Sequence, residues 1–264
     1  HPSLKDDDKP KIPHQSSATG MQAIPTTGVA MGIAYQEHRK LGQWKKPPVV
    51  VCSLGDASVT EGEVAEAFQM AALKKLPILY LIQDNEWDIS ANAKETRAMN
   101  AAEYARGFKG IETRSIDGTD FKLCYDTLEE VIGLIRKERR PFLVHAKVPL
   151  LNHHTSGVRM EWYRDDLEED RQQDPYPKLV STMLLAGWSA LQLKRIETRA
   201  IENVAADFEK ARHAADPTPA DLYTHAFAPT PITTEVGIRQ PEGAEVKVMV
   251  DSALIAIEEL MRKH

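Results

Sequence analysis

Hydrophobic and polar positions alternate along the first part of the chain in blocks that suit strands and helices. Short apolar runs rich in β-branched residues predict strands. These runs span residues 48–54, 77–83, 112–116 and 142–147. Longer segments with apolar residues at helical spacing lie between them, at about 61–74, 99–107 and 120–138. Strands that alternate with helices are typical of an α/β fold with a doubly wound, mostly parallel sheet and helices on both faces.

The segment before this block is different in character. Residues 1–19 are polar and rich in proline and serine, and we expect a loop or an arm there. A helix is predicted from about Pro25 to Leu41, because proline is tolerated in a first helical turn and Gly42 suits a helix end.

The last hundred or so residues change character again. The stretch after residue 165 is polar and then helical twice, with Gly187-Trp188 between the two helices. A proline-rich linker follows, and the chain ends in a strand-like start and an amphipathic helix. The predicted organisation is an α/β domain at 1–160 that is incomplete at its N-terminus, a helical extension at 161–215, a linker at 216–245 and the start of a further module at 246–264.

Composition narrows the class of protein. The chain has 264 residues, of which 42% are hydrophobic and 27% charged, as in ordinary globular proteins. Its net charge of −6 argues against nucleic acid or an anionic membrane as the main partner. No apolar run approaches the length of about 20 residues that spans a bilayer, and no targeting pattern is visible, so cytoplasm is the expected location. Cys52 and Cys124 are predicted to be buried free thiols.

Polar residues follow directly on the first two predicted strands. Gly55-Asp56-Ala57 ends one strand and Asp84-Asn85 ends the next. Ligands of an open α/β sheet bind beyond the carboxyl ends of its strands, so Asp56 and Asn85 are expected to converge. One carboxylate and one amide oxygen suit Mg²⁺, which keeps few protein ligands and completes its shell with phosphate and water. The alternative is an ordinary βαβ unit with polar turn residues.

These residues resemble the thiamine-diphosphate signature, GDG followed at this spacing by NN, with Ala57 and Asp84 as departures. The resemblance implies the thiamine-diphosphate-binding fold, with thiamine diphosphate and Mg²⁺ as cofactors. It implies Asp56, the Asn85 side chain and the main-chain carbonyl of Trp87 as metal ligands. The cofactor-binding residues that it implies are Gln22, Gly55, Asp56, Ala57, Ser58, Gln83, Asn85 and His154.

A second polar cluster follows the last predicted strand. His153-His154-Thr155 is succeeded by Arg159 and Arg164, a set that could contact phosphate or carboxylate; a plain surface loop is the alternative. The cluster is similar to the loop that ends in YR in the alpha half of the 2-oxoacid dehydrogenase decarboxylating component. That resemblance implies a catalytic His154 and places Thr155 where some relatives are phosphorylated. Gly157-Val158-Arg159 replaces an acidic pair of those relatives.

Further matches extend the resemblance over about residues 14–215. The segment with Ser16, Ser17 and Gln22 is similar to one that contacts the cofactor, and Asp117-Gly118-Thr119-Asp120 resembles the family's DGND, with Asp120 as an expected helix cap. Residues 246–264 look like the opening of the family's beta half. The chain is therefore expected to be part of a fused alpha-beta polypeptide that has further residues on its N-terminal side.

The resemblance implies oxidative decarboxylation of a 2-oxo acid and acyl transfer to a lipoyl-bearing acyltransferase core. The glutamate that activates the cofactor comes from the beta half in this family, and Glu61 and Glu63 lie on the diphosphate side instead. We therefore expect activity only with a beta half, in a heterotetramer. A transketolase-like thiamine enzyme and a non-catalytic interaction module with a vestigial cofactor fold are the alternatives.

Overall fold

The computed structural model describes residues 9–13, 17–42, 44–155, 157–221, 242–243 and 245–263. It divides into two compact units, residues 1–198 and 199–264. The first unit contains the sheet and every residue that sequence analysis singles out for chemistry. Within the described ranges, no helix combines the length and the apolar character of a membrane span.

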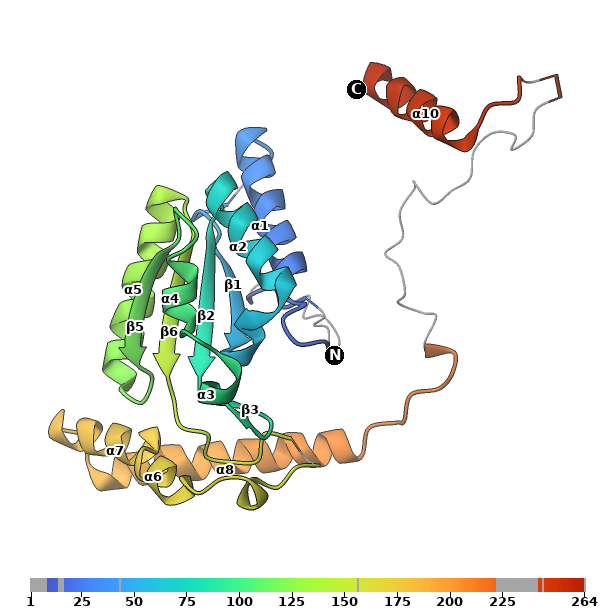
Figure 1. Cartoon of the computed structure of the whole chain (residues 1–264). Coiled ribbons are helices and arrows are strands. Elements are labelled where there is room, and N and C mark those ends of the chain that lie inside the picture. Colours follow the sequence, from blue (N-terminus) through green and yellow to red (C-terminus); the bar gives the residue numbers. More distant parts are fainter. Residues whose placement is uncertain are drawn as a thin grey trace. The chain divides into compact units, whose positions relative to one another are not determined.

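Four parallel strands form the central sheet of the first unit, in the order β1-β2-β6-β5 (Figure 1). The predicted parallel arrangement is confirmed, with boundaries that differ by one or two residues. Strand β1 begins later than expected because Pro47 and Pro48 have no amide hydrogen to donate to a ladder. The strands are β1 (Val50–Gly55), β2 (Ile78–Asp84), β5 (Glu112–Asp117) and β6 (Phe142–Lys147).

Three helices cover one face of the sheet. Phe68 of α2 packs in the centre of this layer, with its ring 4.6 Å from that of Tyr80 on β2. Tyr80 is buried, and its hydroxyl lies 3.0 Å from that of Thr27 on the first helix. The predicted range of α1 lay two to three residues too far along the chain, and the predicted range of α4 was two residues too long at each end. The helices are α1 (Ala23–His38), α2 (Gly62–Lys74) and α4 (Ala101–Ala105).

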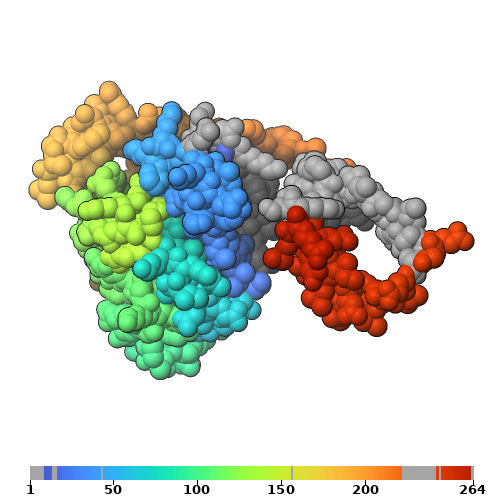
Figure 2. All heavy atoms as spheres, turned by 90° about the horizontal axis from the view of Figure 1, so that it is seen from above, coloured from blue at the N-terminus to red at the C-terminus, as the bar shows by residue number. Residues whose placement is uncertain are grey.

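Helix α5 (Phe121–Glu138) covers the opposite face, so the doubly wound prediction is confirmed. Val131 and Ile135 of this helix are fully buried against Leu79 and Phe142 of the sheet. Each such side chain contributes on the order of 2 kcal/mol by leaving water. Figure 2 shows the end of α5 beside the end of α1, where Arg139 and Glu37 form an ion pair of 2.5 Å.

Small elements lie beyond the carboxyl ends of β1 and β2 (Figure 1). Sequence analysis missed the hairpin and the one-turn helix among them, because strands of two residues carry no periodicity. The hairpin also uses non-glycine residues with positive φ, Glu86 at 63° and Ile89 at 53°. These elements are the 3-10 helix η1 (Ala57–Thr60), β3 (Trp87–Asp88), β4 (Ala91–Asn92) and α3 (Ala93–Thr96).

The part that follows β6 is helical, as expected, with Gly187-Trp188 between two of its helices. Lys178 joins it to the sheet, since its ammonium donates to Thr119 Oγ1 at 2.5 Å. Asp120 caps α5 by accepting the amide hydrogen of Leu123 at 3.0 Å, as predicted. The elements are η2 (Met160–Trp162), α6 (Leu167–Gln172), α7 (Pro175–Leu185), α8 (Ala190–Arg212), which crosses the boundary between the units, and α10 (Met249–Lys263) in the second unit.

Two local predictions are wrong. Cys52 is buried, and burial raises the pKa of its thiol to about 11, but Cys124 is only partly buried on α5. Residues 245–248 form no strand before α10. Most of the predicted linker at 216–245, and Ser16, lie outside the described residues.

Candidate functional site at the carboxyl edge of the sheet

The acidic and amide residues at the ends of β1 and β2 lie together. Asp56 is 3% exposed, and its Oδ1 faces the amide nitrogen of Asn85 at 3.5 Å. Strands β1 and β2 pair in register from Val50 with Ile78 to Gly55 with Gln83, so the residues that follow each strand emerge at the same edge. The convergence expected from the sequence is therefore seen, and its cause is the parallel register.

Side-chain turns hold the loop after β2. Asp84 Oδ1 accepts the amide hydrogen of Glu86 at 3.0 Å, and Asn85 Oδ1 accepts that of Trp87, also at 3.0 Å. These bonds stabilise the left-handed conformation of Glu86, which an ordinary side chain adopts at a cost. Asn85 is thereby held with its amide oxygen at the start of the hairpin.

A guanidinium that sequence analysis did not single out lies against the two acids. Arg97 follows α3, and its side chain is 8% exposed. One of its terminal nitrogens lies 2.5 Å from Asp56 Oδ2 and 3.7 Å from Asp84 Oδ1. Arg97 belongs to no recognisable motif, so only the fold could reveal this contact.

A buried histidine completes the cluster. His145 on β6 is 7% exposed, and its Nε2 lies 2.6 Å from Asp84 Oδ2. Burial raises the pKa of the Asp84 carboxyl, but hydrogen bonds with His145, Asp56 and the Glu86 amide outweigh it and hold the pKa at about 2. An ionised Asp84 can only accept, so Nε2 of His145 carries the hydrogen of this bond. A histidine inside the apolar run FLVHAKV is the one sequence signal for this pair.

The pKa of Asp56 is shifted in the opposite direction to that of Asp84. Burial raises the pKa of its carboxyl, and the nearby charge of Asp84 raises it further, while Arg97 lowers it incompletely. The cluster therefore holds two carboxyl groups at close range with a single guanidinium between them.

The residues present suit a divalent cation. Asp56 Oδ2 is buried and accepts no hydrogen bond from the residues that the structure describes; its contact with Arg97 satisfies the distance of an ion pair only. The Asn85 side-chain oxygen lies in the adjacent turn, where it accepts the amide hydrogen of Trp87. No group of three or more histidine, cysteine, aspartate or glutamate residues in the described ranges could hold a metal, so a metal here would depend on this mixed set.

Residues before and after β1 border the same edge. Gly20 precedes α1 with φ of +80°, and a Cβ there would lie 2.9 Å from that of Glu61, so glycine allows this segment to approach the start of α2. Gln22 Nε2 donates to the carbonyl of Ser53 at 3.2 Å, and the Ser53 and Gln83 side chains bond to each other. The expected residues Gln22, Gly55, Ala57, Ser58 and Gln83 thus follow the edge of β1 and β2. Ala57 lies in a right-handed 3-10 helix, which alanine adopts readily.

The histidine loop after β6 is only partly as expected. His154 is exposed, and His153 is exposed with its Nδ1 accepting the amide hydrogen of Met160 at 3.3 Å. Among the described residues, the network of Asp56, Asp84, Arg97 and His145 does not include His154. In this chain His154 therefore faces solvent from the loop after β6.

Arg164 is not a free anion-binding group. Its side chain is fully buried, forms ion pairs with Asp166 at 2.7 Å and Asp170 at 2.6 Å, and donates to the carbonyl of Leu150. Its guanidinium also lies 5.1 Å from the ring centre of Trp87. The expectation that Arg164 contacts a ligand is wrong, because two carboxylates already neutralise it; it fixes the loop and Trp87 in place.

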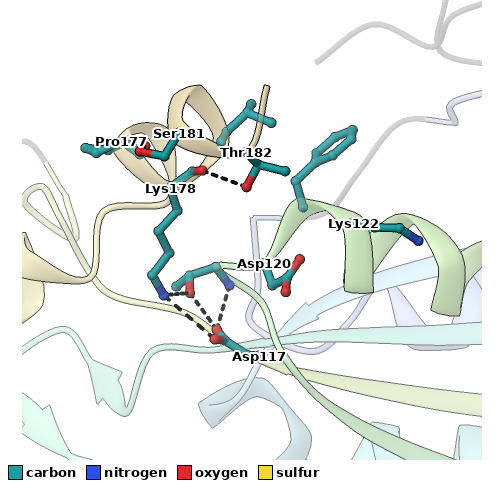
Figure 3. A pocket seen from close by; sticks show the side chains of 10 residues that line it. Asp117, Asp120, Lys122, Pro177, Lys178, Ser181 and Thr182 are labelled. Carbon is teal, nitrogen blue, oxygen red and sulfur yellow. Dashed lines mark hydrogen bonds and ion pairs between the residues drawn. The ribbon is translucent and has the colours of Figure 1, made fainter. Parts of the chain in front are cut away.

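A separate cavity of about 530 Å³ opens beside the Asp117–Asp120 turn (Figure 3). Lys178 of α7 reaches across it to Asp117, at 3.8 Å, and to Thr119. A Cβ on Gly118 would lie 2.5 Å from Val148 and 2.8 Å from the carbonyl of Lys147, so this turn needs glycine. These contacts dock α7 on the sheet and account for the DGTD motif as a structural feature.

Comparison with known proteins identifies the family of the chain. The family model of the dehydrogenase E1 component matches residues 2–220. The chain is 28% identical over 177 residues to a pyruvate dehydrogenase E1 component subunit alpha of Rickettsia bellii, covering 66% of this chain and 54% of that protein. It is 30% identical over 185 residues to a 3-methyl-2-oxobutanoate dehydrogenase subunit alpha of Mycobacterium tuberculosis, covering 69% and 48%.

Other relatives give the same picture. A mitochondrial 2-oxoisovalerate dehydrogenase subunit alpha of Mus musculus is 27% identical over 207 residues, covering 76% of this chain and 46% of that protein. The chain thus spans about half the length of these relatives. A transketolase structure from Campylobacter jejuni aligns with 48% of this chain and 20% of its own, at 26% identity and a TM-score of 0.43. Because the family model matches most of its length, the chain belongs to the dehydrogenase E1 component family, and its relatives are the alpha subunits of that family.

Proposed function

We propose that this chain binds the magnesium and diphosphate end of thiamine diphosphate in a 2-oxoacid dehydrogenase. The buried Asp56 carboxylate, whose Oδ1 faces the Asn85 amide and whose Oδ2 meets the Arg97 guanidinium at ion-pair distance, is the observation that carries this proposal. A buried carboxylate is costly unless a cation compensates it, and this one lies at the edge where β1 and β2 end.

Three groups would hold the metal: the Asp56 carboxylate, the Asn85 side-chain oxygen and the main-chain carbonyl of Trp87. The two side-chain turns after β2 support this role, since their hydrogen bonds to the backbone hold Asn85 and Trp87 in one position. Gln22, Gly55, Ala57, Ser58 and Gln83 would border the cofactor along the same edge, and His154 would approach it from the loop after β6. Bound thiamine diphosphate supplies the carbanion chemistry that decarboxylation of a 2-oxo acid requires.

The partners follow from the relatives. Their names describe alpha subunits that act on pyruvate or on branched 2-oxo acids. We propose a small 2-oxo acid as substrate, a beta half that completes the active site, and a lipoyl-bearing acyltransferase core that receives the acyl group. The domain division at 160, 215 and 245 and a cytoplasmic location belong to the same proposal, although the Mus musculus relative is mitochondrial by name.

One observation favours a second candidate. Arg97 already supplies a positive charge to Asp56, which a non-catalytic interaction module with a vestigial cofactor fold could retain in place of a metal. The two candidates differ in their response to cofactor, because only the first binds thiamine diphosphate in a Mg²⁺-dependent manner.

Reconstitution tests the enzymatic proposal. The chain would be combined with the beta subunit of a related pyruvate or branched-chain 2-oxoacid dehydrogenase, thiamine diphosphate and Mg²⁺. Turnover of pyruvate and 3-methyl-2-oxobutanoate would be followed with an artificial electron acceptor. We expect turnover with both halves and none with this chain alone. Robust turnover by the isolated chain would refute the assignment of the activating glutamate to a beta half.

A further inference from the structure

Arg97 occupies the position where the proposed function places the metal. Its guanidinium lies 2.5 Å from Asp56 Oδ2, the same buried oxygen that accepts no hydrogen bond from the described residues. The contact is electrostatic in nature, and a divalent cation would make the same kind of contact with a higher charge. Metal and guanidinium therefore compete for one carboxylate oxygen.

The local structure brings Arg97 to this oxygen from the end of α3. Arg97 follows α3, which has only four residues and is held at its start by a capping box of Asn92 and Glu95. The backbone of Arg97 itself is extended, with φ of −137° and ψ of 135°. The amide of Arg97 donates to the Ala93 carbonyl at 2.9 Å, so the backbone is held at the end of α3 and only rotation about the bonds of the arginine side chain can move the guanidinium.

A place for the displaced guanidinium exists next to it. A cavity of about 250 Å³ borders Arg97, and Glu86 and Glu103 are among the residues that line it. Glu86 pairs with Lys147 at 3.2 Å, and Glu103 accepts the amide hydrogen of Asn100 at 2.9 Å. A guanidinium that rotated into this cavity would share these carboxylates with their present partners while Asp56 became available.

We propose that Arg97 is a displaceable internal cation that competes with a divalent metal for Asp56 and lowers the affinity of the site for that metal. This inference rests on the proposed function for the identity of the ion, and it assigns Arg97 a positioning role. The consequence is an apparent metal affinity reduced by the fraction of chains in which Arg97 holds Asp56.

Binding of Mn²⁺ alone, followed by electron paramagnetic resonance on the full chain, tests the proposal. Mn²⁺ prefers the same oxygen ligands as Mg²⁺. We expect Arg97→Gln to bind Mn²⁺ at least about tenfold more tightly than the unaltered chain, and Arg97→Lys, which keeps the charge, to remain close to it. Arg106→Gln is the matched control, because Arg106 donates to Thr113 near the amino end of β5. The Arg97→Gln/Asp56→Asn double variant should lose the gain.

Equal Mn²⁺ affinity of Arg97→Gln and the unaltered chain, or no Mn²⁺ binding by Arg97→Gln, would overturn the proposal. Should Arg97→Gln fail to fold, the ¹⁵Nε–Hε resonance of Arg97 in the unaltered chain gives the answer: Mg²⁺ should accelerate its hydrogen exchange, and an unchanged exchange rate would overturn the proposal as well. A failure of the proposed function is recognised separately. In that case Arg97→Gln gains Mn²⁺ affinity while thiamine diphosphate still does not bind.

Discussion

Replacing Asp84 by asparagine tests the charge cluster at the carboxyl edge and restores the residue of the thiamine-diphosphate signature. Asp84 is 6% exposed and uses both oxygens, one for the Glu86 amide and one for His145. Asparagine has a single acceptor oxygen and can satisfy only one of these donors in the same way. The substitution therefore removes a charged hydrogen bond from a buried place.

The pKa of Asp84 gives the size of the stabilisation that its carboxylate contributes. It is about 2 in the folded chain against 3.8 for the ordinary value, a lowering of about 1.8 units. At 1.36 kcal/mol for each unit, the ionised carboxylate contributes about 2 kcal/mol to the free energy of unfolding at neutral pH. Because the pKa of Asp84 is lower in the folded chain than in the unfolded chain, its carboxylate stabilises the fold at pH values above the unfolded pKa. This contribution is lost as pH falls from about 4 towards 2. At pH 3 it should be about 1 kcal/mol.

Urea unfolding at pH 7 and pH 3 measures this contribution. We expect Asp84→Asn to reduce the free energy of unfolding by about 2 kcal/mol at pH 7 and by about half as much at pH 3. Asp88→Asn is the matched control, because Asp88 is exposed on the adjacent hairpin and should change little. A loss that is the same at both pH values, or no loss at all, would refute the account of the Asp84–His145 pair.

Two further predictions concern the loops that border the site. His154→Ala should leave the fold intact and lower turnover of the reconstituted assembly by about two orders of magnitude, the usual scale for a positioned acid-base group; His153→Ala should cost less, and equal effects would favour a plain surface loop. Gly118→Ala should lower the free energy of unfolding in urea by about 1–3 kcal/mol, since its Cβ would lie 2.5 Å from Val148. Gly133→Ala is the control, because a Cβ there has no neighbour within 4 Å, and equal stability of the two variants would contradict the packing argument.

The sequence was sufficient for the framework and for part of the site. Apolar runs such as Ile78–Asp84 predict strands because they are short, β-branched and bounded by polar turns. Parallel pairing then brings Asp56 to Asn85 by topology alone. The hairpin at Trp87–Asn92 could not be predicted, because its shape depends on two left-handed non-glycine residues held by side-chain turns.

Contacts between segments that are distant in the sequence were the main feature that could not be predicted. Arg97 meets Asp56, and His145 meets Asp84, only because β1, β2 and β6 lie side by side, and no spacing along the chain encodes either pair. Arg164 was predicted to contact a ligand, because it follows two histidines. The fold instead pairs it with two carboxylates, Asp166 and Asp170. Charge in a sequence does not reveal whether the fold has already neutralised it.

The central claim is that Asp56 and Asn85 bind Mg²⁺ with thiamine diphosphate, and calorimetric titration of the cofactor tests it most directly. The titration would use the chain with its beta partner, in the presence of Mg²⁺. Loss of a residue that only orients a metal ligand costs about 10–100-fold in metal affinity, so loss of a ligand itself should cost at least that much. Asp56→Ala is expected to weaken binding by about 100-fold or more, and Asn85→Ala less, because an amide contributes no net charge. Asp88→Ala should bind as the unaltered chain does. Unchanged affinity in Asp56→Ala would contradict the claim.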